Sequence, residues 1–199
     1  RESGARADVV DLGRGERFVH WWHDPIAAER AVGAIGRALA AADPAHADAY
    51  RRRAAAYAAR LRALDRELRA CLARVPAAQR KLVTDHDAFG AFARRYGIRV
   101  VGAVIPSQST QAQASAGDLA RLSRTIEREH VRAVFPETSV SPRVARAIAR
   151  QTGASARYTL YGDTLGPAGS AGAMYLGMER ANADAMVRGF TGGREGCAR

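Results

Sequence analysis

The sequence predicts an α/β protein with a mostly parallel sheet, helices on both faces of that sheet, and a long helix before it. Two observations lead to this fold class. Apolar residues recur at helical spacing in two successive segments as far as Pro76, and beyond Pro76 short apolar strands alternate with helices. Alternating strands and helices are typical of parallel sheets, because a crossover helix must return the chain before each new parallel strand.

Two helix starts lie in the first quarter of the chain, and each pairs an aspartate with a proline. In Asp24-Pro25 the aspartate suits the cap position and the proline suits the first turn, where a missing N–H costs nothing. Asp43-Pro44 repeats the signal. The apolar face expected for the first helix consists of Val32, Ile35 and Leu39.

The second helix is expected to be unusually long. Its apolar stripe consists of Tyr50, Tyr57, Leu61, Leu64, Leu68 and Leu72. About 30 residues at 1.5 Å each give roughly 45 Å, which exceeds the width of a small domain. Such a helix could cross more than one lobe, or it could be a plain core helix in a bundle.

The elements after Pro76 are short. Strands are expected at 81–84, 98–105 and 131–135, with a weaker one at 157–160. A polar loop over 106–117 separates the second strand from the helix that follows it. Apolar residues at helical spacing place the helices around Phe92, Leu122 and Met178, and a further helix starts at Ser141-Pro142 and runs to Gly153.

The formal net charge of +11 does not indicate a nucleic-acid partner. Lys81 is the only lysine, and this preference for arginine is typical of a GC-rich coding bias. The arginines are also scattered among acidic residues. A nucleic-acid-binding surface would require a clustered basic stripe. No run of 18 apolar residues is present, so no membrane-spanning helix is expected. Cys71 and Cys197 match no metal-binding spacing, and whether they pair is left open.

Polar residues follow the predicted strands at the edge where ligands bind in parallel sheets. His86 follows the first strand, Glu137 the third and Asp163 the fourth, while His20 precedes the first helix. Imidazoles combined with carboxylates suit zinc or a similar divalent ion. On spacing alone, a lone histidine at a strand end is more often a hydrogen-bonded structural residue than a ligand.

Ordered motifs over residues 20–190 resemble the zinc/manganese substrate-binding proteins of ABC importers. His20-Trp21-Trp22-His23-Asp24-Pro25 is similar to the family's His-x-Trp-x-Asp-Pro motif, and Thr84-Asp85-His86-Asp87-Ala88-Phe89 is similar to its most recognisable motif. Val134-Phe135-Pro136-Glu137, the Asp163 loop, and Met174-Tyr175-Leu176 with Asn182 follow in the family's order.

The resemblance implies two α/β lobes joined by one rigid helix, with a metal ion held between the lobes and no catalysis. It implies His20, His86 and Asp163 as ligands, with Glu137 holding a ligand in place and a further histidine belonging to an amino-terminal lobe. The expected cargo is Zn²⁺, with Mn²⁺ as the alternative, and the expected partner is an ABC permease in the membrane. The expected location is extracytoplasmic, either in the periplasm or on the cell surface.

The same resemblance divides the chain into four parts. Residues 1–19 are read as the remnant of an amino-terminal lobe, 20–76 as connector and linking helix, 77–192 as the carboxy-terminal lobe, and 193–199 as a tail. Without an opposing lobe, the stripe residues Tyr50, Tyr57 and Leu61 are expected to be uncovered.

The other histidines and Trp22 are given structural interpretations. His23 is expected at the surface, because it occupies the variable position of its motif, and His46 and His130 are expected to be solvated. Trp22 is expected to pack between the connector and the lobes.

Two alternative functions are a metallohydrolase and an arginine-rich module that binds protein or nucleic acid. A hydrolase would need a general base and an open coordination position, and no dedicated base is evident.

Overall fold

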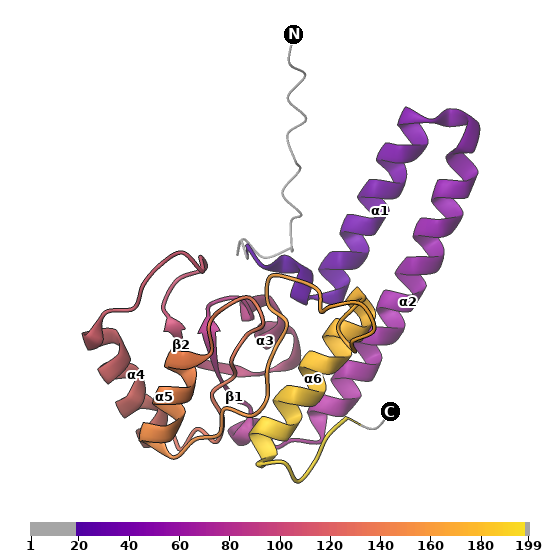
Figure 1. Cartoon of the computed structure of the whole chain (residues 1–199). Helices are drawn as coiled ribbons and strands as arrows, with labels where there is room; N and C mark the ends of the chain where they lie inside the picture. Colours follow the sequence, from indigo (N-terminus) through magenta and orange to yellow (C-terminus); the bar gives the residue numbers. More distant parts are fainter. Residues whose placement is uncertain (1–18, 198–199) are drawn as a thin grey trace.

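A computed structural model describes residues 19–197 (Figure 1). The region expected to be an amino-terminal remnant, 1–19, therefore lies almost entirely outside the described residues. The helices are α1 (Pro25–Ala42), α2 (Ala47–Ala73), α3 (Gly90–Tyr96), α4 (Ala116–Arg128), α5 (Arg143–Thr152) and α6 (Tyr175–Thr191). The strands are β1 (Lys81–His86) and β2 (Arg99–Ile105). Short 3-10 helices cover Trp21–His23, Pro44–His46 and Ala77–Gln79.

Helices α1 and α2 form an antiparallel hairpin that projects from the rest of the molecule (Figure 1). The predicted start of α1 is confirmed, because Oδ1 of Asp24 accepts the N–H of Ile26 at 2.8 Å. The predicted apolar face of α1 is wrong in part, since Ile35 and Leu39 are 58% and 44% exposed. Small residues face α2 instead: a Cβ on Gly36 would lie only 2.7 Å from the Cβ of Ala54. The two helices approach too closely for large side chains between them.

Helix α2 carries the predicted apolar stripe over its 27 residues. Leu64, Leu68 and Leu72 are buried, and Tyr50 and Tyr57 are half-buried. The expectation that Leu61 is uncovered is wrong, because its exposure is 0%. Leu61 belongs to the same core cluster as Ala28 of α1, so the hairpin itself contributes to covering it.

The sheet is parallel, as predicted, but its regular part is small. β1 pairs with β2 from Lys81↔Arg99 to His86↔Ile105, with an irregularity at Leu82/Val83. The strands expected at 131–135 and 157–160 appear as isolated parallel bridges, which are Thr84↔Phe135, Ala133↔Ser155 and Glu137↔Leu160. Pro136 lies between the bridged residues Phe135 and Glu137 and has no N–H to donate, which is one reason for the interrupted ladder.

Helices cover both faces of this sheet, as the sequence predicts. Leu82 points into a core shared with α2, α3 and α6, whereas Val83 points into a second core shared with α4 and α5. Adjacent strand residues face opposite sides, so one strand contributes to both cores. The loop expected over 106–117 is shorter than predicted, because Ser115 and Asp118 form a capping box that starts α4 at Ala116.

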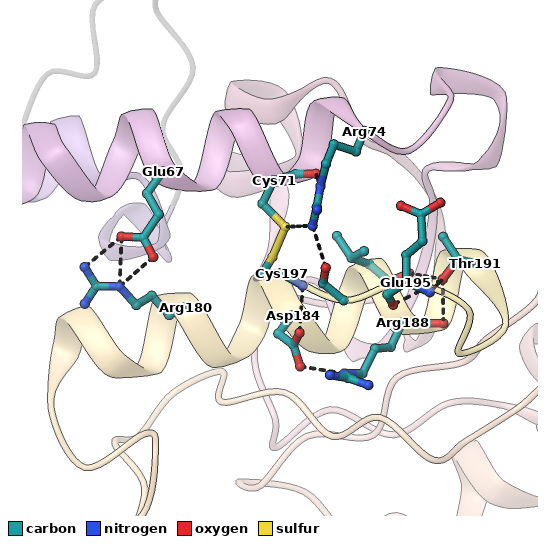
Figure 2. The surroundings of a disulfide bond; sticks show 11 residues. Glu67, Cys71, Arg74, Arg180, Asp184, Arg188, Thr191, Glu195 and Cys197 are labelled. Carbon is teal, nitrogen blue, oxygen red and sulfur yellow. Dashed lines mark hydrogen bonds and ion pairs between the residues drawn. A yellow bond between two sulfur atoms is a disulfide. The ribbon is translucent and has the colours of Figure 1, made fainter. Parts of the chain in front are cut away.

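A disulfide answers the question that the two cysteines leave open. Cys71 near the end of α2 is bonded to Cys197 beyond α6, with the Cα atoms 5.4 Å apart. Figure 2 shows Arg74 and Asp184 beside the bond: Arg74 donates to the carbonyl of Gly196, and Asp184 accepts the N–H of Cys197. In the part of the chain that the structure describes, no helix is long and apolar enough to cross a membrane.

Candidate metal centre

The three predicted ligands meet at one point. Nε2 of His20 and Nε2 of His86 lie 3.3 Å apart. Oδ1 of Asp163 lies 3.2 Å from the first nitrogen and 3.3 Å from the second. The residues come from the turn before α1, the end of β1 and the loop before α6, so three distant parts of the chain supply one donor each.

Burial differs among the three donors. Both imidazoles are almost fully buried, whereas the side chain of Asp163 is 29% exposed. The site is therefore built on a rigid interior side and one accessible carboxylate.

Glu137 lies behind His86 and fixes the ring. Its Oε2 is 2.9 Å from Nδ1 of His86, and its Oε1 accepts the backbone N–H of the same residue at 3.0 Å. The N–H of Glu137 in turn donates to Oδ2 of Asp85 at 2.8 Å. Because the carboxylate occupies Nδ1, the other nitrogen of His86 faces the site.

The two histidines have opposite pKa shifts. Burial and the neighbouring charge of His86 lower the pKa of His20, which favours the neutral imidazole that a metal ion requires. Burial also works to lower the pKa of His86, but the carboxylates of Glu137 and Asp163 outweigh it and raise that pKa. Behind the site, burial raises the pKa of Asp85 to about 6.

The loop that carries Asp163 approaches the site through a glycine. A Cβ on Gly162 would collide with Oε2 of Glu137, so only glycine fits without moving that carboxylate. The residue before Gly162 is Tyr161, and the side chain of Asn182 on α6 holds both of its backbone polar groups. Asn182 accepts the N–H of Tyr161 at 2.8 Å and donates to its carbonyl at 3.0 Å. The backbone before Asp163 is thus anchored to the last helix.

The surface position expected for His23 is wrong. Its side chain is fully buried, with Nδ1 2.8 Å from Oε1 of Glu179 and Nε2 3.0 Å from the carbonyl of Gly162. Glu179, also fully buried, was not identified from the sequence. The available signal was its position on α6, four residues after Tyr175 and three before Asn182, on a helix face that is otherwise buried.

The other interpretations agree with the structure. His46 and His130 are exposed. Trp22 is partly buried and donates through Nε1 to the carbonyl of Gly162 at 3.2 Å, so it packs against the loop before Asp163.

Two buried imidazoles and one accessible carboxylate form a candidate metal site, and comparison with known proteins gives the family of the chain. The family model described as the periplasmic component A of the zinc-uptake complex matches residues 15–189. The chain therefore belongs to that family.

Several characterised relatives carry different metals in their names. The manganese-binding lipoprotein MntA of Bacillus subtilis is 32% identical over 186 residues, which cover 90% of this chain and 60% of the relative. The iron-binding protein YfeA of Yersinia pestis is 34% identical over 86% of this chain and 54% of its own length. The solved structure of the periplasmic zinc-binding protein TroA of Treponema pallidum matches with a TM-score of 0.81 at 30% identity, covering 93% of this chain and 68% of TroA. The chain thus spans little more than half the length of the curated relatives that it matches.

Proposed function

We propose that this chain binds one divalent transition-metal ion through His20, His86 and Asp163, as the substrate-binding component of an ABC importer. The observation that carries the proposal is the near-equilateral triangle of donor atoms, with sides of 3.2 to 3.3 Å. Tetrahedral zinc with bonds of about 2.0–2.1 Å separates its ligand atoms by about 3.3 Å. The three donors therefore match one face of a zinc tetrahedron.

Zinc is the proposed cargo in preference to manganese. Two of the three donors are imidazole nitrogens, which suit zinc, whereas manganese favours oxygen donors. Relatives named for zinc, manganese and iron share the family, so the donor set of this chain and not its family membership supports the choice.

Delivery without catalysis is part of the proposal, and it depends on a fourth protein ligand in addition to these three donors. Tetrahedral sites with four protein ligands suit binding, whereas catalytic zinc keeps a position for water. We propose that a fourth ligand from outside these three residues fills the remaining coordination position. Residues 20–76 would link the lobe 77–192 to the part of the protein that carries this fourth ligand. A membrane permease would then open the site to release the ion. An extracytoplasmic location agrees with the Cys71–Cys197 disulfide, since disulfides persist in oxidising compartments.

A competition titration tests the proposal. The protein is titrated with Zn²⁺ and, separately, with Mn²⁺ against a chromophoric chelator, beside a variant in which His20, His86 and Asp163 are all alanine. We expect tighter binding of Zn²⁺ and loss of both metals in the variant. Equal affinities or a tighter Mn²⁺ complex would contradict the choice of zinc, and unchanged binding by the variant would exclude the site.

A further inference from the structure

His23 and Glu179 form a second buried histidine–carboxylate pair, one turn away from the metal centre. Both side chains are fully buried, and the imidazole stacks on the ring of Phe89 with centroids 4.3 Å apart. The pair joins the start of the chain's described part to α6, since 156 positions separate the two residues. Its outer nitrogen does not face the metal donors but the carbonyl of Gly162.

The hydrogen positions on this imidazole follow from its partners. A carbonyl oxygen only accepts, so Nε2 of His23 carries the hydrogen in its bond to Gly162. Nδ1 lies 2.8 Å from a carboxylate oxygen of Glu179, so a hydrogen also lies between these two atoms. Glu179 therefore fixes the ring in the orientation that donates to Gly162.

The carbonyl of Gly162 is held by two donors at once. Trp22 donates through Nε1 at 3.2 Å and His23 through Nε2 at 3.0 Å, which uses both lone pairs of the oxygen. The next residue is Asp163, where the chain becomes exposed. The last fixed backbone group before the accessible ligand is thus held by residues that are not ligands.

Burial of this pair has a cost that packing alone does not explain. The second carboxylate oxygen of Glu179 has no hydrogen-bond partner among the described residues. Apolar residues of similar volume are often as stabilising as a buried ion pair. A buried polar pair with an unsatisfied atom is accordingly better explained by a positional task.

We propose that His23 and Glu179 are positioning residues that hold the Gly162 carbonyl and thereby set Asp163 for metal binding. The role in affinity rests on the proposed metal-binding function, whereas the restraint on the loop does not. Removing the pair is expected to release the 161–166 segment in the metal-free protein and to weaken Zn²⁺ binding about tenfold, as loss of supporting contacts behind ligands commonly does.

The experiment separates positioning from stability with paired variants of the full chain. His23→Phe keeps a ring against Phe89 but leaves the Glu179 carboxylate buried without a partner, so it is expected to lower the melting temperature. The double variant His23→Phe/Glu179→Met removes that carboxylate as well and is expected to recover most of the lost stability. Arg180→Ala, which lies beside Glu179 but bonds only to the exposed Glu67, is the matched control.

Two readouts are compared across these variants: amide hydrogen exchange of residues 161–166 without metal, and Zn²⁺ affinity by chelator competition. In the double variant we expect about tenfold faster exchange and about tenfold weaker binding despite recovered stability. Glu179→Gln, which can still hydrogen-bond Nδ1 of His23, is expected to lose less Zn²⁺ affinity than Glu179→Met. Parental exchange and affinity in the double variant would overturn the proposal. If the parent itself failed to bind Zn²⁺, the proposed function would be wrong, and the exchange data would still decide the restraint.

Discussion

Two histidine–carboxylate pairs lie beside the segment that leads to Asp163, and in each of them Nδ1 of the imidazole is close to a carboxylate oxygen. His86 has its Nδ1 2.9 Å from Glu137, and His23 has its Nδ1 2.8 Å from Glu179; all four side chains are fully buried. The pairs differ in what faces Nε2. Nε2 of His86 faces Nε2 of His20 and a carboxylate oxygen of Asp163. Nε2 of His23 faces the backbone carbonyl of Gly162.

The difference shows that the outer contact decides the role of such a pair. Three donor groups around one point can share a cation, so we infer that Nε2 of His86 contributes a lone pair. A carbonyl requires a hydrogen, so Nε2 of His23 donates. The same residue types therefore hold a ligand in one pair and a backbone group in the other. Substitutions in the two pairs should accordingly differ in the size and kind of their effects.

The largest effect is expected at His86. His86→Ala removes a donor and also the ring beside Oε2 of the buried Glu137, so Zn²⁺ affinity should fall by more than about 100-fold, beyond the loss typical of supporting residues. Chelator competition measures the loss. His86→Gln keeps a hydrogen-bonding group near Glu137 and guards against misfolding, and His46→Ala, at an exposed histidine, is the control. A loss of less than tenfold in both His86 variants would mean that His86 is not a ligand.

The next effect is expected at Asp163. Asp163→Ala should weaken Zn²⁺ binding at least about tenfold, because it removes the carboxylate donor. Thr164→Ala changes the adjacent exposed residue, which makes none of the contacts that define the site, and should change little. Isothermal titration of both variants provides the measurement. Equal losses in the two variants would show that the loop as a whole, and not the Asp163 carboxylate, contributes the affinity.

A smaller effect is expected at Glu137. Glu137→Gln keeps the size of the side chain but removes the charge that holds a hydrogen on Nδ1 of His86, so Nε2 becomes less available to the metal. We expect about tenfold weaker Zn²⁺ binding. NMR of the His86 ring should show a changed tautomer in the metal-free variant. An unchanged tautomer with parental affinity would argue that Glu137 only supports the fold.

The sequence predicts which residues gather at the candidate metal site better than it predicts the His23–Glu179 pair beside it. His86, Glu137 and Asp163 follow strands, and strand ends in a parallel sheet gather at one edge whatever the details of packing. His23 was misassigned because its burial depends on α6, which begins about 150 residues later and docks Glu179 against it. Neither local periodicity nor motif spacing carries that information.

Similar limits explain the other errors. Ile35 and Leu39 fit a helical apolar face, but the close approach of α1 to α2 at Gly36 selects small residues for the contact. The third and fourth strands were located correctly in the chain, yet they form isolated bridges. Strand propensity does not determine how many ladder hydrogen bonds survive next to a proline.

The smallest effect on metal binding is expected from the disulfide, although its effect on stability should be large. Cys71 and Cys197 close a loop of 126 positions, and restricting the unfolded chain over such a loop stabilises by about 2–5 kcal/mol. The bond ties α2 to the segment that follows α6 (Figure 2). The polar contacts of His23, His86 and their carboxylates involve neither cysteine.

The double variant Cys71→Ala/Cys197→Ala should therefore unfold at lower denaturant concentration and keep parental Zn²⁺ affinity. Since zinc stabilises only the folded state, saturating metal should raise the unfolding free energy by the same increment in variant and parent. Glu67→Gln, which breaks the exposed pair with Arg180 between α2 and α6, serves as the control for surface electrostatics. If the variant lost affinity together with stability, α6 would need its covalent attachment to hold Glu179 in place. In that case the backbone around Gly162, which the His23–Glu179 pair holds, should show faster amide exchange than the backbone around His86.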